Sequence, residues 1–280
     1  MHWLTSRFDI DLSSPRVMGI VNVTPDSFSD GGRFASTSAA LAHCEVLLKE
    51  GADILDIGGE STRPGSPAVS LEDELARVLP VLREAARLGV PVSIDTYKPE
   101  VMRAALDAGV DIINDIWALR QGDALDVVAA HARCGICLMH MHRDPQTMQV
   151  APMEGDVLPG VSAFLRERAE ALAARGVARG RIVLDPGVGF GKTVAQNLSL
   201  LARQSELLPL GLPVLAGWSR KSTLGAVTGH ERPADRAAAS VAAALLAVDR
   251  GARVVRVHDV RDTVDALKLW QAMQNEAAPR

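Results

Sequence analysis

Short apolar segments, each ending in a polar cluster, recur along the whole chain. Most of them are followed by a segment with helical periodicity, an alternation typical of parallel strands joined by helical crossovers. Eight such repeats in 280 residues predict an α/β fold, a closed (β/α)8 TIM barrel whose active site forms at the carboxyl ends of the strands. The expected strands are residues 17–23, 53–58, 91–95, 111–115, 136–140, 181–185, 213–217 and 253–258, and the expected helices are 36–50, 70–88, 99–108, 123–133, 159–175, 236–250 and 260–273.

The barrel is expected to be a single domain, because no low-complexity linker interrupts the pattern. Residues 1–16 are expected to form an N-terminal arm or strand pair below the barrel, residues 17–275 the catalytic barrel, and residues 276–280 a tail. The loops after the first, second and fifth strands are longer than usual connections, which often marks a binding loop or lid.

The net charge and the hydrophobic pattern indicate which kinds of partner the protein can bind. The net charge of −4 gives no general attraction to nucleic acid or to anionic membranes, so an anionic substrate would need a local basic cluster. The first residues contain scattered charges and no apolar core of a signal peptide, and no apolar run is long enough to span a bilayer. We therefore expect a cytoplasmic enzyme with no nucleic-acid or membrane partner.

The spacing of His131, Cys134, Cys137 and His140 is compatible with a zinc site. However, residues 136–140 are expected to be a strand that follows a helix closed by Gly135, and strand residues three apart point to opposite faces. The favoured interpretation is buried thiols in a reducing compartment.

The segment from Pro186 to Thr193 ends like a phosphate-binding P-loop. The P-loop pattern requires glycine where Pro186 stands, so a nucleotide triphosphatase is not expected. Its glycines would instead let the backbone approach a flat ligand beside Asp185.

Several charged residues stand at strand ends. Asp95 and Asp185 could each hold the paired N–H groups of a guanidine-like heterocycle, or form a salt bridge at the barrel rim. Lys221 could be a Schiff-base lysine, a phosphate clamp or a donor to a ring carbonyl. Arg256 and His258 are two apart on a strand, share one face, and could both grip a phosphate.

Longer motifs now show a resemblance to the bacterial dihydropteroate synthases, from about Val17 to the C-terminal helix. They resemble the family's signatures in order: MGIVNVTPDSFSDGG, DIGGESTRPG, SIDT, IND, LDPG, SRKS and RVHD. The resemblance implies that p-aminobenzoate condenses with 6-hydroxymethyl-7,8-dihydropterin diphosphate, giving 7,8-dihydropteroate and pyrophosphate in folate synthesis.

Matching positions imply roles for individual residues. Asn22 would bind Mg²⁺ on the diphosphate, and Thr62, Arg256 and His258 would hold phosphate oxygens. The pterin edge would be read by Asp95, Asn114, Asp185 and Lys221, with Arg256 also stacking on the ring. The p-aminobenzoate would lie near Phe28, Arg63, Pro64, Phe190, Ser219 and Ser222, with its carboxylate at the start of the helix after the seventh strand.

We expect an SN1-like substitution, in which loss of pyrophosphate leaves a resonance-stabilised pterin cation. Asp26 or Asp95 would offer it negative charge, and the catalytic set would be Asp26, Arg63, Asp95 and Lys221. The chain departs from the family at Trp218, where a smaller residue is usual, and at residues 142–145, where a glycine-containing turn is common.

Two alternatives from other classes remain. A pterin-binding methyltransferase of the same superfamily should lack the diphosphate set of Asn22, Thr62, Arg256 and His258. A non-catalytic pterin-binding paralogue would be expected to have lost the first or second loop, and both are intact. The resemblance also implies a homodimer formed through the last helices.

Overall fold

Eight parallel strands close into a barrel in the computed structural model, which describes residues 1–24, 32–61 and 65–277. The ring closes because β10 pairs in parallel with both β9 and β3. The predicted (β/α)8 barrel is therefore confirmed. In barrel order the strands are β10 (Ala252–Val257), β3 (Arg16–Asn22), β4 (Ile54–Gly58), β5 (Val92–Asp95), β6 (Ile112–Asp115), β7 (Gly135–Met139), β8 (Ile182–Asp185) and β9 (Val214–Ala216).

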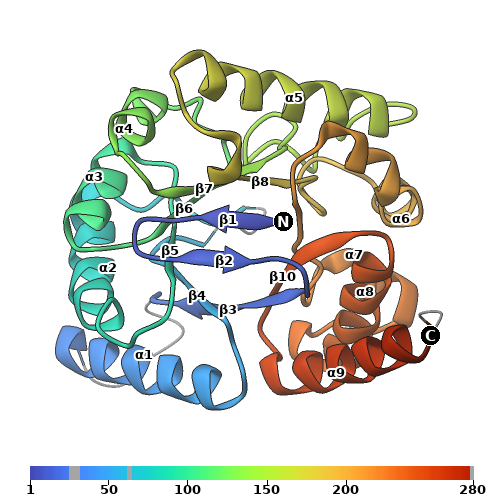
Figure 1. Ribbon diagram of the computed structural model, residues 1–280, viewed down its shortest axis with the longest axis horizontal. Helices are drawn as coiled ribbons and strands as arrows, with labels where there is room; N and C mark the ends of the chain where they lie inside the picture. The colour runs from blue at the N-terminus through green and yellow to red at the C-terminus, as the bar shows by residue number, and fades with distance from the viewer. Residues whose placement is uncertain (25–31, 62–64, 278–280) are drawn as a thin grey trace.

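Helices surround the barrel (Figure 1). Local sequence sets several of their starts: Ser70 caps α2 by accepting the N–H of Asp73, and Thr193 and Gln196 form a capping box on α6. The helices are α1 (Gly32–Lys49), α2 (Leu71–Ala85), α3 (Pro99–Asp107), α4 (Ala124–Ala130), α5 (Leu158–Ala174), α6 (Val194–Ala202), α7 (Ser222–Thr228), α8 (Ala237–Asp249) and α9 (Val260–Ala277), with short 3₁₀ helices at Arg179–Arg181, Gln204–Leu210 and Pro233–Arg236.

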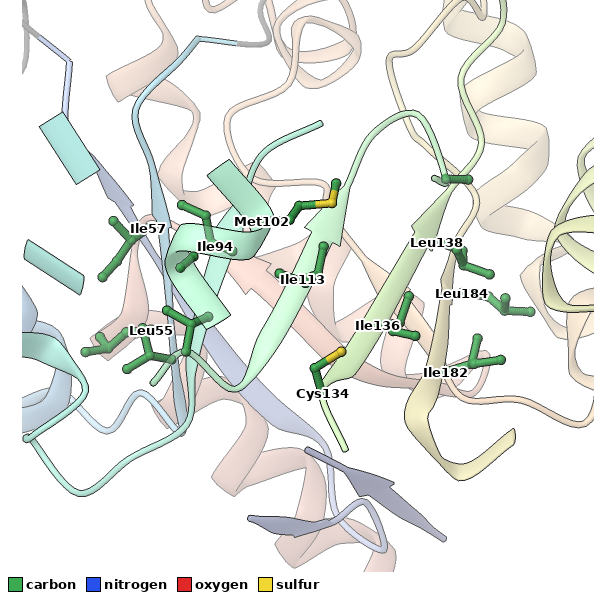
Figure 2. Packing of buried hydrophobic residues seen from close by; sticks show 14 of the residues in the cluster. Leu55, Ile57, Ile94, Met102, Ile113, Cys134, Ile136, Leu138, Ile182 and Leu184 are labelled. Atoms are coloured by element: carbon green, nitrogen blue, oxygen red, sulfur yellow. The ribbon is translucent and has the colours of Figure 1, made fainter. Parts of the chain in front are cut away.

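Strand alternation divides the core into two parts. Leu55, Ile57, Ile94 and Ile113 belong to the outer core, which is formed with the helices around the barrel (Figure 2). The alternate residues point into the barrel, and the lower ones form an apolar floor of Met18, Ile54, Ile112, Cys137, Val183, Leu215 and Val254. Because this floor fills the lower part of the barrel, we expect a ligand to enter from the carboxyl ends of the strands.

An antiparallel pair, β1 (His2–Leu4) and β2 (Asp9–Asp11), lies across the amino end of the barrel, as the sequence predicted (Figure 1). Trp3 belongs to the same apolar cluster as the floor and donates its Nε1–H to the carbonyl of Arg181 at 2.9 Å. A Cβ on Gly135 would lie only 3.0 Å from the Trp3 indole nitrogen, so glycine allows this close approach.

Several expected boundaries were wrong. The first helix begins at Gly32 and not at residue 36, and the second ends at Ala85 and not at residue 88. The helix expected at 123–133 ends at Ala130, and Gly135, expected to close it, is instead the first residue of β7. Its role is the close approach to Trp3 rather than helix termination. The last helix continues beyond residue 273 to Ala277, because the residues that follow are compatible with a helix. Among the described residues, no helix is long and apolar enough to cross a membrane.

Candidate active site

A layer of polar side chains lies inside the barrel above the apolar floor. Each member stands two positions after an inward-facing residue, so strand alternation turns it inward as well. The layer contains Asp56 on β4, Asp95 on β5, Asn114 on β6, Asp185 on β8 and Arg256 on β10. Five strands thus bring polar groups to one buried place at the carboxyl end of the barrel.

Arg256 joins three strands through charge-assisted hydrogen bonds. Its Nε donates to Asp56 Oδ2 at 2.6 Å and its Nη2 donates to Asp95 Oδ2 at 2.7 Å. Burial by itself lowers the pKa of Arg256, but the two carboxylates outweigh it and raise the pKa above its usual value. The guanidinium therefore stays charged at the centre of the layer.

Asp95 forms a salt bridge with Arg256, which was one of the two interpretations that the sequence left open. Burial raises the pKa of its carboxyl group, and the Arg256 guanidinium offsets part of that rise. The partner was not evident from the sequence because Arg256 lies 161 positions further along the chain. Binding a ligand through Asp95 would require it to share or exchange this partner.

The loop that follows Asp185 sets the orientation of its carboxyl group. The N–H of Gly187 donates to Asp185 Oδ1 at 2.7 Å, while burial raises the pKa of the carboxyl group and this hydrogen bond lowers it in part. Gly187 has φ of 68°, and a Cβ there would lie 1.8 Å from the carbonyl oxygen of His140. Only glycine permits this turn, so the predicted close backbone approach beside Asp185 is present.

The remaining described candidates surround the layer. Lys221 Nζ lies 4.2 Å from the centroid of the Phe190 ring, a cation–π contact. His258 contacts Ser219 twice: its Nδ1 is 3.0 Å from Ser219 Oγ, and its backbone N–H donates to that oxygen at 3.1 Å. Asn22 ends β3, and Ser222 begins α7 directly after Lys221.

An apolar wall accompanies the polar layer. Ile116, Met139, Met141 and Met148 form a buried cluster with Phe190. Flexible methionine side chains can adapt to the face of a flat ring. A cavity of about 180 Å³ opens beside this wall and is lined in part by Ile116, Tyr97 and Trp117.

Five candidates from the first two long loops lie outside the described residues: Asp26, Phe28, Thr62, Arg63 and Pro64. The two departures from the family pattern do lie in the described part. Trp218 is buried in a cluster that includes Val188 and Leu224. Arg143 has φ of 63°, the left-handed region in which a glycine would be unstrained.

The alternative zinc site is contradicted by the positions of its members. Cys134 lies in the outer core, with Sγ accepting from Arg181 Nη2 at 3.1 Å, whereas Cys137 lies in the floor inside the barrel. His131 Nδ1 accepts the backbone N–H of Cys134 at 2.9 Å. These side chains do not converge on one point.

Several buried polar residues were missed from the sequence, Asp56 and Lys192 among them. Asp56 was quoted only as part of a family motif. It stands two residues after Ile54 on the same strand, so it could have been predicted to face the same way as Ile54. Lys192 donates from Nζ to the carbonyl oxygens of Gly187 at 2.8 Å, Phe190 at 3.1 Å and His140 at 3.4 Å. Nothing local in the sequence indicated this arrangement.

Comparison with known proteins agrees with this geometry. The family model described as "Pterin binding enzyme" matches residues 18–258. The dihydropteroate synthase of Neisseria meningitidis serogroup B is 53% identical over 276 residues, 97% of each chain, and that of Escherichia coli K12 is 47% identical over 264 residues, 94% of this chain and 93% of the relative.

Two solved structures extend the likeness to the fold. The Xanthomonas albilineans dihydropteroate synthase with 4-aminobenzoic acid has a TM-score of 0.91 and 54% identity, over 97% of this chain and 96% of that one. The Burkholderia cenocepacia dihydropteroate synthase complexed with 7,8-dihydropteroate has a TM-score of 0.89 and 52% identity, over 99% of this chain and 97% of that one. With such likeness over nearly its whole length, this chain belongs to the pterin-binding enzyme family and, within it, to the dihydropteroate synthases, transferases of folate synthesis.

Proposed function

We propose that this chain condenses 6-hydroxymethyl-7,8-dihydropterin diphosphate with p-aminobenzoate to give 7,8-dihydropteroate and pyrophosphate. The observation that carries the proposal is the buried polar layer, in which Asp95, Asn114, Asp185 and Arg256 meet at the carboxyl end of the barrel. Carboxylates and an amide in a dry pocket suit a flat heterocycle with several N–H groups.

Each polar residue has a distinct part in holding the pterin. The Asp185 carboxylate accepts the paired N–H groups of the guanidine-like edge, and Lys221 donates to the ring carbonyl. Asn114 offers both an N–H donor and a carbonyl acceptor, and the Arg256 guanidinium stacks on the ring face. The methionine-rich wall near Phe190 covers the apolar faces of the ring.

The diphosphate end requires positive charge. Arg256 supplies it from β10, and His258 and the hydroxyl of Thr62 would hold phosphate oxygens. Asn22, at the carboxyl end of β3, fits a Mg²⁺ site because Mg²⁺ prefers oxygen ligands and is usually held by one or two protein oxygens together with substrate phosphates. When bound, Mg²⁺ would neutralise charge on the leaving group.

We propose a dissociative substitution. The bond between the pterin CH₂ and the diphosphate oxygen breaks first, and its electron pair leaves with pyrophosphate. Asp95, or Asp26 on the first loop, stabilises the pterin cation by its negative charge. The amino nitrogen of p-aminobenzoate then uses its lone pair to form the new bond, and its proton passes to the released pyrophosphate or to water. Because an arylamine is a weak base, its placement matters more than its deprotonation.

The p-aminobenzoate would lie near Phe190, Ser219 and Ser222, with its carboxylate at the start of α7. The family pattern adds Phe28, Arg63 and Pro64 to this set. Support for this placement comes from the pairing of Ser219 with His258, which brings the loop after β9 next to the end of β10.

Pyrophosphate release from the pterin diphosphate, measured with and without p-aminobenzoate, tests the proposal. We expect release coupled to formation of dihydropteroate. Methyl transfer to or from a pterin without pyrophosphate release would favour the methyltransferase alternative, and pterin binding without turnover would favour the non-catalytic paralogue.

We further propose that the chain forms a homodimer through its last helices. Helices α8 and α9 contact each other, and α8 is apolar almost throughout. Leu246, Leu269 and Met273 on this side of the molecule are 45%, 74% and 54% exposed in the single chain. Exposed apolar side chains grouped on adjacent helices are typical of a protein–protein interface.

A further inference from the structure

Asp56 is the most deeply buried member of the polar layer for which the proposed reaction has no role. Its side chain has no exposed surface, and it stands two positions above Ile54 of the apolar floor. In the strand register it lies opposite Ile20 of β3 and Ser93 of β5. It therefore forms the bottom of the pocket that the pterin would enter.

One oxygen of Asp56 receives two donors from different strands. Oδ2 accepts Arg256 Nε at 2.6 Å and Asn114 Nδ2 at 3.2 Å. The two donors come from β10 and β6, each of which is separated from β4 by one strand, on opposite sides. Asp56 thus ties together two of the groups expected to touch the pterin.

The chemistry of this oxygen determines the orientation of the Asn114 amide. An arginine guanidinium can only donate, so Asp56 Oδ2 acts as the acceptor toward Arg256. The Asn114 atom that faces this oxygen must then be the NH₂ nitrogen, because two oxygen acceptors would repel each other. Asn114 is left with its carbonyl oxygen and its second N–H for a ligand.

Two other polar atoms near Asp56 Oδ2 have no partner within the described part of the protein, which indicates that a ligand could bind there. Among the described residues, Asp56 Oδ1 and Ser93 Oγ are buried and have no hydrogen-bond partner. Buried polar atoms of this kind are rare, because each costs free energy when it is unpaired. Both can still bond to a ligand group or to a water molecule.

We propose that Asp56 is a positioning residue for the pterin, which acts by accepting from Asn114 and so fixing which end of that amide the ligand meets. This inference rests on the proposed function, because the pterin is the ligand that Asn114 is expected to read. Asp56 acts as a hydrogen-bond acceptor and need not touch the reacting atoms.

Comparison of Asp56→Ala with Asp56→Asn tests this role. The alanine variant removes the acceptor, and we expect its KM and dissociation constant for the pterin substrate to rise about tenfold, equivalent to about 1.4 kcal/mol, with little change in the KM for p-aminobenzoate. The asparagine variant keeps an amide oxygen that can take both donors, so it should stay within about threefold of the unchanged protein. If asparagine is as damaging as alanine, the negative charge matters and the proposal is overturned.

A double variant and a control separate positioning from structural support. In an Asn114→Ala background, Asp56→Ala should weaken pterin binding by less than about threefold, because the residue through which it acts is gone. Equal losses in both backgrounds would contradict the proposal. Asp111→Ala removes another fully buried carboxylate, which pairs with Arg7 near the amino end of the barrel. It should lower the melting temperature without changing pterin affinity.

A replacement variant and a separate measurement of pterin binding allow the role of Asp56 to be tested if Asp56→Ala does not fold or if the protein is inactive. If Asp56→Ala does not fold, Asp56→Val, which fills the space without an acceptor, replaces it and should show the same loss. Pterin affinity is measured by calorimetry alongside pyrophosphate release. A wild-type protein that binds pterin but releases no pyrophosphate would contradict the proposed function, while the calorimetry would still decide the role of Asp56.

Discussion

Asp185 illustrates how a single residue is prepared for a ligand before the ligand arrives. Its strand carries it into the barrel, and Gly187 turns the chain so that a backbone N–H holds Oδ1 at 2.7 Å. The carboxylate is thus fixed in orientation by its own loop, which reduces the entropy lost when it binds.

We predict that Asp185→Ala weakens pterin binding by about 2–4 kcal/mol, because ring N–H donors would be left unpaired in a dry pocket. Isothermal calorimetry with a pterin measures the effect. Asp235→Ala, which removes a partly exposed carboxylate paired with Arg232, is the matched control and should bind normally. Normal binding by a folded Asp185→Ala protein would refute the role assigned to this residue.

The three cysteines are expected to be inert. Burial raises the pKa of Cys44 to about 11, and it raises the pKa of Cys134 and Cys137 as well. Since the thiolate is the reactive form, we predict that alkylating reagents modify them only after unfolding. Mass spectrometry of native and denatured protein gives the number of modified thiols, and rapid native modification of any of them would contradict this.

Replacing Cys134 and Cys137 together by alanine or serine should leave activity largely intact, because neither residue has a role in the proposed reaction. The melting temperature should fall, since both thiols are fully packed. Elemental analysis completes the test: stoichiometric zinc that disappears with these residues would overturn the buried-thiol interpretation.

At the scale of elements, the loop between β8 and α6 is held by one buried lysine. Lys192 is 2% exposed, and its Nζ donates to carbonyl oxygens of its own loop and of the residue after β7. Asn197 of α6 adds support by accepting the N–H of Gly189 and donating to Thr223 of α7. The loop that carries Phe190 is therefore held from within and from two neighbouring elements.

Lys192 predicts an unusual dependence of stability on pH. Burial lowers its pKa to about 7, whereas an unfolded lysine titrates near 10.5. Between these values the unfolded chain binds more protons than the folded one. The contribution of Lys192 to the free energy of unfolding therefore rises with pH in this window, by at most about 1.4 kcal/mol per pH unit.

Urea denaturation of Lys192→Met between pH 7 and 10.5 measures this contribution. The difference between wild type and variant should grow in favour of the wild type as the pH rises. Lys49→Met, at an exposed position on α1, is the control and should run parallel to the wild type. Parallel curves for Lys192→Met as well would mean that the three carbonyl oxygens keep its pKa near the usual value.

At the scale of the whole molecule, the two segments at residues 24–33 and 59–69, which the sequence predicted to be long loops, are expected to complete the site. They are rich in Gly, Pro and Ser, lack the apolar periodicity needed to pack themselves, and carry Asp26, Thr62 and Arg63. We propose that Mg²⁺ with pyrophosphate orders both loops and so completes the p-aminobenzoate pocket through Phe28 and Pro64.

p-Aminobenzoate alone should then bind weakly, because it would have to supply the ordering entropy of both loops, on the order of 1 kcal/mol per residue fixed. Titration with and without Mg-pyrophosphate and a pterin tests this order of binding, with Mg²⁺ alone as the control. Equal affinity under all conditions would indicate a pocket already formed in the free protein.

The assembly of the molecule is open to a direct test. Changing Leu246 and Leu269 to glutamate should convert a dimer into a monomer, because charges would replace apolar contacts at the proposed interface. Sedimentation velocity measures the mass. Val150→Glu, at a residue that is 85% exposed in the segment after β7, is the control and should leave the assembly unchanged. A wild-type monomer at micromolar concentration would refute the interface.

The sequence alone determined most of the elements. Short apolar runs predicted the barrel strands, and the helical periodicity that follows most of them predicted most helices, because these signals act between residues that are close in the chain. The family motifs identified most candidate site residues, again because they stand directly at strand ends. Boundaries such as Gly135 were wrong because a distant contact, with Trp3, decides the role of that glycine.

Only the tertiary structure decided which side chains of those elements meet. Asp56 and Arg256 are 200 positions apart and become partners when β10 closes the barrel against β3. The three carbonyl oxygens around Lys192 come from two strand ends that are brought together in the same way. The physical reason is that hydrogen bonds and ion pairs in a buried layer depend on distance in space, which a local pattern of residues does not specify.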